Sequence, residues 1–309
     1  MRSMKQQLTY AVRSNTAIGQ SKHSEKSKGK GMKGAHHDGR SYSYSTLNSR
    51  LDTAKQFGNW MKNSHPEIEM ARDISADHVN EFLREKAETC RSATLESYAS
   101  NLRALSREVN KTYHCQSYNP VEINTPSSEK EASRTMPMQH KDIERLKSSF
   151  KTDSVGHRAI CMEQATGARV EGLTKLTAGD IRILSRDRAE VYIHGEKGGR
   201  NRTVDVVGEE HVRELDHIKE IIPEKERICP VKPDSLNKAF NRHLKQLGLK
   251  DKYELTSTHA MRKEWAQRTY DRYRETHSKL ESVKYTNKQL GHGAERDQVL
   301  LDRYVANVH

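Results

Sequence analysis

The chain is poor in the residues that build large apolar cores and covalent frameworks. Of its 309 residues only 33 % are hydrophobic and 6 % aromatic, with 7 prolines and 4 cysteines. No apolar run approaches the roughly 20 residues that cross a bilayer, so an integral membrane protein is excluded. The scattered cysteines show no CxxC spacing, which argues against a zinc ribbon or a disulfide framework and favours a reducing cytoplasm.

Charge is what the chain has in excess. Lysine and arginine number 54 against 42 acidic residues, which gives a net charge of +12 and a pI of about 9.4. This balance excludes an acidic solvating chain and favours a polyanion as the partner. In residues 1–40 nine basic residues oppose only Glu25 and Asp38. Because this segment is also rich in Gly, Ser and Lys, it is predicted to be a flexible basic arm.

Three amphipathic segments follow this arm. Their apolar residues recur at intervals of three and four, which predicts helices over 45–63, 73–87 and 92–113. Three helices of this length form a small bundle rather than a sheet domain. We therefore expect a helical domain over residues 41–115.

The next segment, 116–137, has the composition of an interdomain linker, with serines and charges between Pro120, Pro126 and Pro137. Beyond it, helical periodicity is interrupted by β-branched segments with turn signals between them, at 181–184, 190–195 and 201–207. The chain is thus predicted to be mainly α, and residues 138–309 to contain one small antiparallel β-sheet.

Several short motifs follow one another through this second region. They are a T-G-A-R turn at the start of a helix, a glycine-flanked lysine between two strands, an H-A-M-R pair on one helical face, an L-G-H turn and a late tyrosine. In chain order they supply Arg169, Lys197, His259, Arg262, His292 and Tyr304. No single motif is decisive, but their order and spacing form one composite pattern.

This pattern resembles that of the tyrosine recombinases, the phage-integrase family, across residues 136–309. Residues 41–115 likewise resemble the family's core-binding (SAM-like) domain, including T-L-x-x-Y-x-x-N-L-R-A-L. The resemblance implies a site-specific DNA recombinase or integrase, as in mobile elements, that cuts and rejoins strands through a 3′-phosphotyrosyl intermediate without a cofactor. It also implies a nucleoid-associated cytoplasmic protein that acts as a homotetramer on paired double-stranded DNA sites, and it admits an accessory directionality factor.

The chemistry of phosphoryl transfer explains the basic residue types. Attack on a phosphodiester adds negative charge to its nonbridging oxygens, so the site needs fixed donors aimed there. Guanidinium groups bind phosphate bidentately and stay charged, which suits Arg169 and Arg262. His292 would add a hydrogen bond to a nonbridging oxygen.

Proton transfer explains the others. Tyr304 would be the nucleophile, and His259 would accept its proton or orient the phosphate. Lys197 would protonate the leaving 5′ oxygen. Other tyrosines of this region compete as the nucleophile, and the family's order favours Tyr304 over Tyr270, Tyr273 and Tyr285.

The chain departs from the family's pattern at the acid that usually follows the first arginine by three positions. That position is Gly172, and the nearest acid is Glu171, which is expected either to support Arg169 in its place or to mark a rearranged helix. Only five residues follow Tyr304 in this sequence, whereas many members continue into a segment that docks on a neighbouring subunit. How subunits would dock is therefore left open.

Basic residues that would contact DNA gather on the third helix and on the hairpin. They are Arg91, Arg103, Arg107, Lys111, Arg200 and Arg202. Binding through phosphates should weaken steeply with salt. Two alternatives remain open, a type IB topoisomerase that relaxes supercoils with the same chemistry, and a DNA-binding protein of this fold that does not cut.

Overall fold

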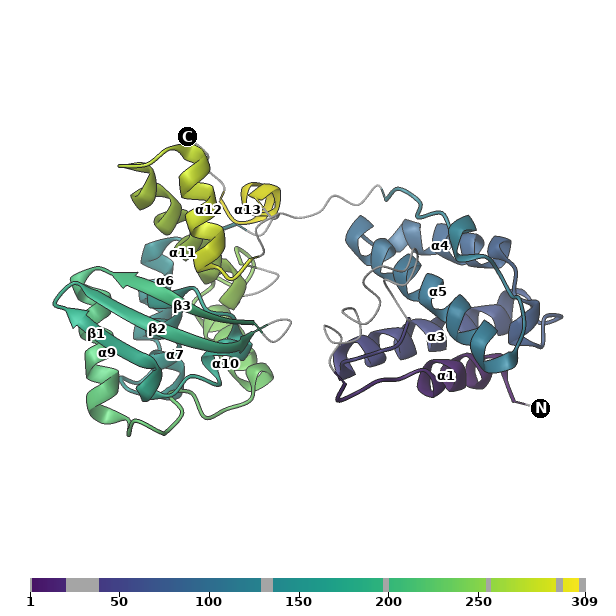
Figure 1. Cartoon of the computed structure of the whole chain (residues 1–309), viewed down its shortest axis with the longest axis horizontal. Coiled ribbons are helices and arrows are strands. Elements are labelled where there is room, and N and C mark those ends of the chain that lie inside the picture. The colour runs from purple at the N-terminus through teal and green to yellow at the C-terminus, as the bar shows by residue number, and fades with distance from the viewer. Residues whose placement is uncertain are drawn as a thin grey trace, which may run out of the picture. The chain divides into compact units, whose positions relative to one another are not determined.

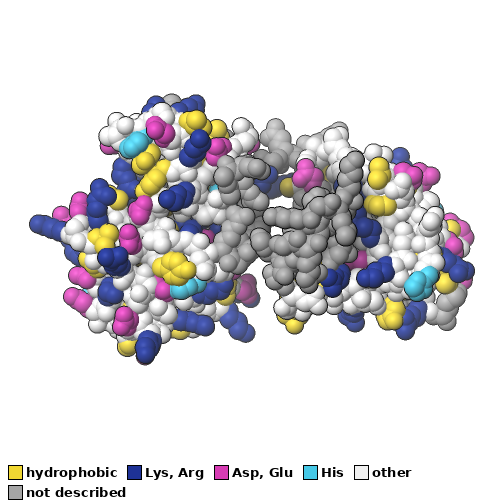
Figure 2. All heavy atoms as spheres, in the orientation of Figure 1, with side chains coloured by type: hydrophobic (Ala, Val, Ile, Leu, Met, Phe, Trp, Pro, Cys, Tyr) yellow, Lys and Arg dark blue, Asp and Glu magenta, His cyan; other side chains and the backbone are white. Residues whose placement is uncertain are grey.

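The chain forms two compact units, Met1–Ser133 and Arg134–His309, called here the N-terminal and C-terminal units (Figure 1). The computed structural model describes residues 2–20, 39–128, 136–196, 200–253, 257–292 and 297–305. Lys and Arg side chains lie over the visible surface of both units, interspersed with Asp and Glu (Figure 2). None of the described helices is long and apolar enough to cross a bilayer.

The N-terminal unit is a helical bundle. Its elements are α1 (Met4–Ser14), α3 (Tyr44–Ser64), η1 (Ala71–Asp73), α4 (Ala76–Thr89), α5 (Ser92–Tyr113) and η2 (Pro120–Glu122). Apolar side chains at helical spacing meet in one core that includes Phe57, Phe82 and Leu102. The three helices predicted from periodicity are therefore confirmed, as α3, α4 and α5.

The flexible arm predicted for residues 1–40 is wrong over α1. Leu8 and Val12 are fully buried, and α1 packs against α3 and α5. The packing is close, because a Cβ added to Gly58 of α3 would lie 2.6 Å from the Cα of Lys5. Residues 21–38 of the predicted arm lie outside the described residues.

The predicted linker over 116–137 is also wrong in its first half. Tyr118 and Ile123 are 3 % and 2 % exposed and belong to the core of the N-terminal unit. The Tyr118 hydroxyl donates to the carbonyl of Leu102 at 2.8 Å, and Ser106 donates to the carbonyl of Tyr118 at 2.5 Å. Residues 116–128 therefore pack on the bundle, and 129–135 lie outside the described residues.

The C-terminal unit combines helices with one sheet. Its helices are α6 (His140–Ser148), α7 (Val155–Thr166), α8 (Val170–Leu173), η3 (Ala178–Asp180), α9 (Glu209–Ile221), α10 (Pro233–Gln246), α11 (Ser257–Arg274), α12 (Lys279–Gln289) and α13 (Asp297–Arg303). The strands are β1 (Ile181–Ser185), β2 (Arg188–Glu196) and β3 (Arg200–Val207).

The three strands form an antiparallel sheet in the order β1-β2-β3. Alternation along β2 buries Val191 and Ile193 and leaves Tyr192 39 % exposed, as expected for a sheet with one covered face. Helices α7 and α9 pack against the sheet (Figure 1). The predicted architecture, mainly α with a small antiparallel sheet, is confirmed.

Candidate active site

A glycine turn positions the first arginine. Helix α7 ends at Gly167, which adopts a left-handed conformation (φ 55°) and donates its N–H to the carbonyl of Glu163 at 2.7 Å. A Cβ at this position would lie 2.5 Å from the ring of Trp265, so both the backbone and the packing require glycine. The chain leaves this turn at Arg169, which is the N-cap residue of α8.

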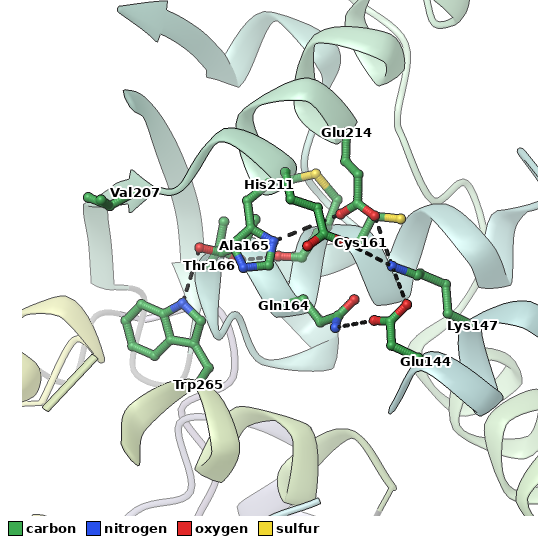
Figure 3. Close-up of polar contacts among 12 residues, drawn as sticks. Glu144, Lys147, Cys161, Gln164, Ala165, Thr166, Val207, His211, Glu214 and Trp265 are labelled. Carbon is green, nitrogen blue, oxygen red and sulfur yellow. Dashed lines mark hydrogen bonds and ion pairs between the residues drawn. The ribbon is translucent and has the colours of Figure 1, made fainter. Parts of the chain in front are cut away.

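Polar side chains of neighbouring helices fix the end of α7 that precedes this turn (Figure 3). Trp265 donates from Nε1 to the carbonyl of Ala165 at 3.1 Å. Lys147 lies 2.8 Å from a carboxylate oxygen of Glu144 and 3.0 Å from one of Glu214. Burial opposes the charge of Lys147, but these two carboxylates raise its pKa above the usual value. Gln164 of α7 donates to Glu144 at 2.9 Å, so the end of α7, and with it the turn, is held from α6 and α11, while Lys147 joins α6 to α9.

The acid that holds Arg169 is Glu196, at the end of β2. One oxygen of its carboxylate accepts the backbone N–H of Arg169 at 2.7 Å, and the other accepts from its guanidinium at 2.9 Å. Arg202 donates to the same carboxylate from Nε at 3.0 Å. Burial alone would raise the pKa of Glu196, but Arg202, Arg262 and these hydrogen bonds lower it below the usual value. Glu196 is therefore an ionised carboxylate inside the protein.

Two predictions from the sequence are corrected here. Glu171 is exposed, so it does not support Arg169. Arg202 is 9 % exposed, pairs with Glu196 and donates from Nη1 to the carbonyl of Gln289, so it is not a DNA-facing residue. Alternation along β2 gives no signal for Glu196, because this residue is out of phase with the buried Val191 and Ile193, and it turns inward only after the register shift between Ile193 and Glu196.

Arg262 is the second guanidinium of the site and is 1 % exposed. It donates from Nη1 to the carbonyl of Gly167 and from Nη2 to the carbonyl of Leu290 at 2.7 Å. Burial, then the nearby arginines, lower the pKa of Arg262 to about 10. The group therefore stays protonated at neutral pH, and it joins the turn at Gly167 to the turn at Leu290 and Gly291 that follows α12.

The ring of Tyr304 lies among the other predicted residues. Its centroid is 5.4 Å from that of His259 and 4.9 Å from that of His292. The guanidinium carbon of Arg262 lies 5.8 Å from the same centroid. Tyr304 directly follows α13 rather than lying within it, and it is 8 % exposed. The structure thus brings three of the predicted residues, His259, Arg262 and His292, together around the phenol ring of Tyr304.

The competing tyrosines are less suited to nucleophilic attack. Tyr285 donates its hydroxyl to Asp205 at 3.1 Å and stacks on Tyr273 with ring centroids 4.1 Å apart. Burial, and then the neighbouring Asp205, raise the pKa of Tyr285 to about 12. Tyr270 is fully buried. These contacts favour Tyr304, as the order of motifs does.

The two histidines differ in their surroundings. Burial, together with Arg262 and Lys263, lowers the pKa of His259 to about 4, so its ring is neutral at physiological pH. His292 bonds from Nδ1 to the amide oxygen of Asn287 at 3.0 Å, and Asn287 donates its own amide N–H to Asp297 at 2.7 Å. These two successive hydrogen bonds orient the His292 ring. Asn287 was not predicted, because its role depends on contacts within and after α12 that no motif marks.

The predicted basic residues are distributed unevenly. Arg107 and Lys111 are exposed on α5, and Arg91 is the N-cap residue of that helix. Arg103 instead donates to the carbonyl of Ile123 at 2.6 Å within the N-terminal unit. Lys197 and the side chain of Arg200 lie outside the described residues. Within the described part of the chain, no group of three or more metal-binding side chains is placed to hold an ion.

Solved structures of tyrosine recombinases have the same fold. The chain matches the XerH site-specific recombinase bound to difH substrate with a TM-score of 0.60 and 16 % identity, over 96 % of this chain and 90 % of that one. It matches a lambda integrase dimer bound to a COC′ core site at 0.61 and 19 %, over 94 % and 79 %. The Tn1549 transposon integrase in complex with circular intermediate DNA matches at 0.56 and 14 %, over 99 % and 96 %. No protein-family profile and no curated protein sequence matches the chain. The predicted tyrosine-recombinase fold is thereby confirmed.

Proposed function

We propose that the protein is a site-specific DNA recombinase that cuts and rejoins strands through a 3′-phosphotyrosyl intermediate. The observation that carries this proposal is the placement of the Arg262 guanidinium and two imidazoles around the Tyr304 ring, by residues that lie far apart in the sequence. The fold supports it, because similar chains are recombinases and integrases in complex with DNA. Tyr304 is the nucleophile of this proposal.

The phosphate would be bound by Arg169 and Arg262. The remaining N–H groups of Arg169 make no hydrogen bond within the described part of the chain, and its side chain is 20 % exposed. The Nε of Arg262 is buried and likewise has no partner there. Both groups are held by the protein before any ligand binds, so their positive charge can stabilise the charge that develops on the nonbridging oxygens without reorganisation.

The chemical step is a transesterification. The Tyr304 oxygen attacks the phosphorus, and its proton passes to His259, whose neutral ring can accept it. The bond from phosphorus to the 5′ oxygen breaks, and Lys197 supplies the proton that turns this oxygen into a hydroxyl. The resulting phosphotyrosyl ester keeps the energy of the phosphodiester, and attack by a 5′ hydroxyl of a partner strand reverses the step. No cofactor or metal takes part in this scheme.

The partner is proposed to be double-stranded DNA, with four copies of the chain assembled on two paired sites. Exposed Arg107 and Lys111 on α5, together with Arg91 at its start, are the proposed DNA contacts of the N-terminal unit. An accessory factor that sets the direction of recombination would act on this assembly. Site-specific recombination of DNA in the cytoplasm is the role that these proposals fit, and integration of a mobile element, excision and resolution are all forms of it.

Covalent trapping tests the chemistry. Nicked suicide duplexes tiled across the DNA that flanks the gene should yield a covalent adduct that resists SDS and maps to Tyr304 by peptide mass. Tyr304→Phe should abolish the adduct and leave DNA binding nearly intact, while the matched control Tyr285→Phe should retain it. An adduct that survives in Tyr304→Phe would overturn the choice of nucleophile. Relaxation of any supercoiled plasmid without regard to sequence would favour a topoisomerase instead.

A further inference from the structure

One carboxylate organises the positive groups of this site without facing solvent. Glu196 is 4 % exposed, and both of its oxygens accept hydrogen bonds from Arg169. Arg202 donates to it as well, and through Nη1 reaches the carbonyl of Gln289. Because its lone pairs are used by these donors, Glu196 acts on its neighbours rather than on a ligand.

The helix that begins at Arg169 leaves room for this carboxylate. Gly172 faces it, and a Cβ added there would lie 3.1 Å from a carboxylate oxygen of Glu196 and 3.1 Å from Cγ2 of Ile193. The glycine has no left-handed conformation to require it. The missing side chain is therefore explained by the space that Glu196 occupies.

The second glycine turn contributes to the same arrangement. Gly291 has φ 69°, and a Cβ there would lie 2.8 Å from Cδ of Arg202. Arg202 can thus extend from the carboxylate to the segment that carries His292. Glu196 therefore links the end of β2, the turn before α8 and the segment after α12.

We infer that Glu196 is a positioning residue. From strand β2 it fixes the guanidinium of Arg169 in the orientation that binds the phosphate, as an acid at position 172 would do from helix α8. The inference rests on the proposed function. Its physical basis is geometric. The carboxylate accepts hydrogen bonds from both the backbone N–H and the guanidinium of Arg169, and so fixes both the backbone position and the side-chain direction of that residue. The basis is also electrostatic, because without this anion three guanidinium groups would share the site uncompensated.

Glu196→Gln tests the inference, because it keeps the shape but places an amide donor among arginine donors. In single-turnover cleavage of the suicide duplex the rate should fall about 100-fold, as expected when a reacting group is displaced by a small distance. DNA affinity should stay within about threefold of the wild type, because the lost contact acts on the reaction step. Glu190→Gln makes the same change on the same strand, at a side chain 37 % exposed, and should cleave normally. A normal rate in Glu196→Gln, or a large loss in Glu171→Gln instead, would overturn the inference.

Relocation of the acid separates positioning from folding. Glu196→Ala removes the carboxylate and clears the space beside position 172. Adding Gly172→Asp to this variant places a new carboxylate one bond beyond the Cβ of residue 172, which faces the space vacated by the Glu196 side chain. The double variant should cleave at least about tenfold faster than Glu196→Ala alone. A double variant that folds, as judged by its thermal unfolding, and yet recovers nothing would count against a positioning role.

A readout without DNA keeps this inference distinct from the proposed function. Phenylglyoxal labels accessible guanidinium groups, and peptide mass reports the labelling of Arg169. Glu196→Gln should label several-fold faster at Arg169 than the wild type or Glu190→Gln. Equal labelling in all three would show that Glu196 does not hold Arg169. If the labelling changes as expected but the wild type forms no adduct on any duplex, the proposed function fails while the arrangement of Arg169 stands.

Discussion

Each unit buries a glutamate against arginine, and the two carboxylates have opposite pKa shifts. Glu108 in α5 is 2 % exposed and accepts one hydrogen bond from Arg50 at 2.6 Å, while its other oxygen has no partner among the described residues. Burial raises the pKa of Glu108 to about 7, although Arg50 opposes the shift. Glu196 is 4 % exposed, but its several donors hold its pKa below the usual value. The donors around a carboxylate, rather than its burial, decide its charge.

A third glutamate completes the comparison. Glu163 in α7 is fully buried, and neither of its carboxylate oxygens has a partner among the described residues. Burial raises the pKa of Glu163 well above the usual value, and the charge of Arg262 offsets this only in part. The three glutamates thus differ in donors at similar burial, and their pKa values follow the donors. Glu196, in the candidate active site, is the most completely paired of the three glutamates.

Removal of one arginine from each pair gives the largest expected difference. Arg202→Met leaves Glu196 charged and incompletely paired, so the free energy of unfolding of the C-terminal unit should fall by about 4 kcal/mol at neutral pH. Arg50→Met should cost the N-terminal unit about 1–2 kcal/mol, because Glu108 can bind a proton instead. Urea unfolding measures each loss in the free energy of unfolding, and hydrogen exchange assigns it to the N-terminal or the C-terminal unit. Equal losses would show that pairing does not distinguish the two carboxylates.

The pH dependence of the N-terminal unit gives the next effect. Between the ordinary pKa of 4.5 and about 7, native Glu108 keeps a proton that the unfolded chain releases. Its contribution to stability is therefore complete below pH 4.5 and falls by about 3 kcal/mol as the pH rises to 7. Glu108→Gln cannot ionise and should remove this decline. Urea unfolding at pH 5 and 7.5 can be followed by Trp60 fluorescence in a Trp265→Phe background. A decline that persists in Glu108→Gln would assign it to another group.

The smallest effect is expected at the carboxyl without donors. Glu163→Gln keeps the shape of a side chain that is neutral in the native protein, so stability at pH 4, where the unfolded chain is largely protonated as well, should change by no more than about 1 kcal/mol. Because the native pKa of Glu163 is raised, the wild type should lose stability as the pH rises, and the variant should not. Thermal unfolding of both proteins at pH 4 and 7 measures this. A stability advantage of Glu163→Gln over the wild type that shrinks as the pH rises would contradict the raised pKa of Glu163.

Sequence patterns predicted the residues that lie within short motifs. Arg169, Arg262 and Tyr304 each belong to a local pattern, and the structure brings them together with His259 and His292 as the order of the motifs implies. Glu196 was missed because its partners come from another turn and another strand, so no spacing marks it. A buried acid is recognised by its donors, and donors that meet through tertiary packing leave no local pattern.

The prediction errors in the N-terminal unit have a different cause. The high charge of residues 1–40 as a whole obscures the helical spacing of Met4, Leu8 and Val12. The prolines after α5 are typical of a linker. Pro120 instead begins the short helix η2, and Tyr118 before it packs in the core. Composition over a long window is a poor guide where a short apolar stripe decides the structure.

The close contact between Gly58 and the backbone of Lys5 has a practical consequence for anyone who shortens this protein. The composition suggests that a clean fragment would begin near Ser41, after the basic segment. Such a fragment would lose α1 and leave the faces of α3 and α5 that cover Leu8 and Val12 open to water. A newly bared apolar surface of this kind promotes self-association. A recombinant fragment trimmed at that residue should therefore precipitate, whereas one that keeps the first turn of α1 should remain dispersed.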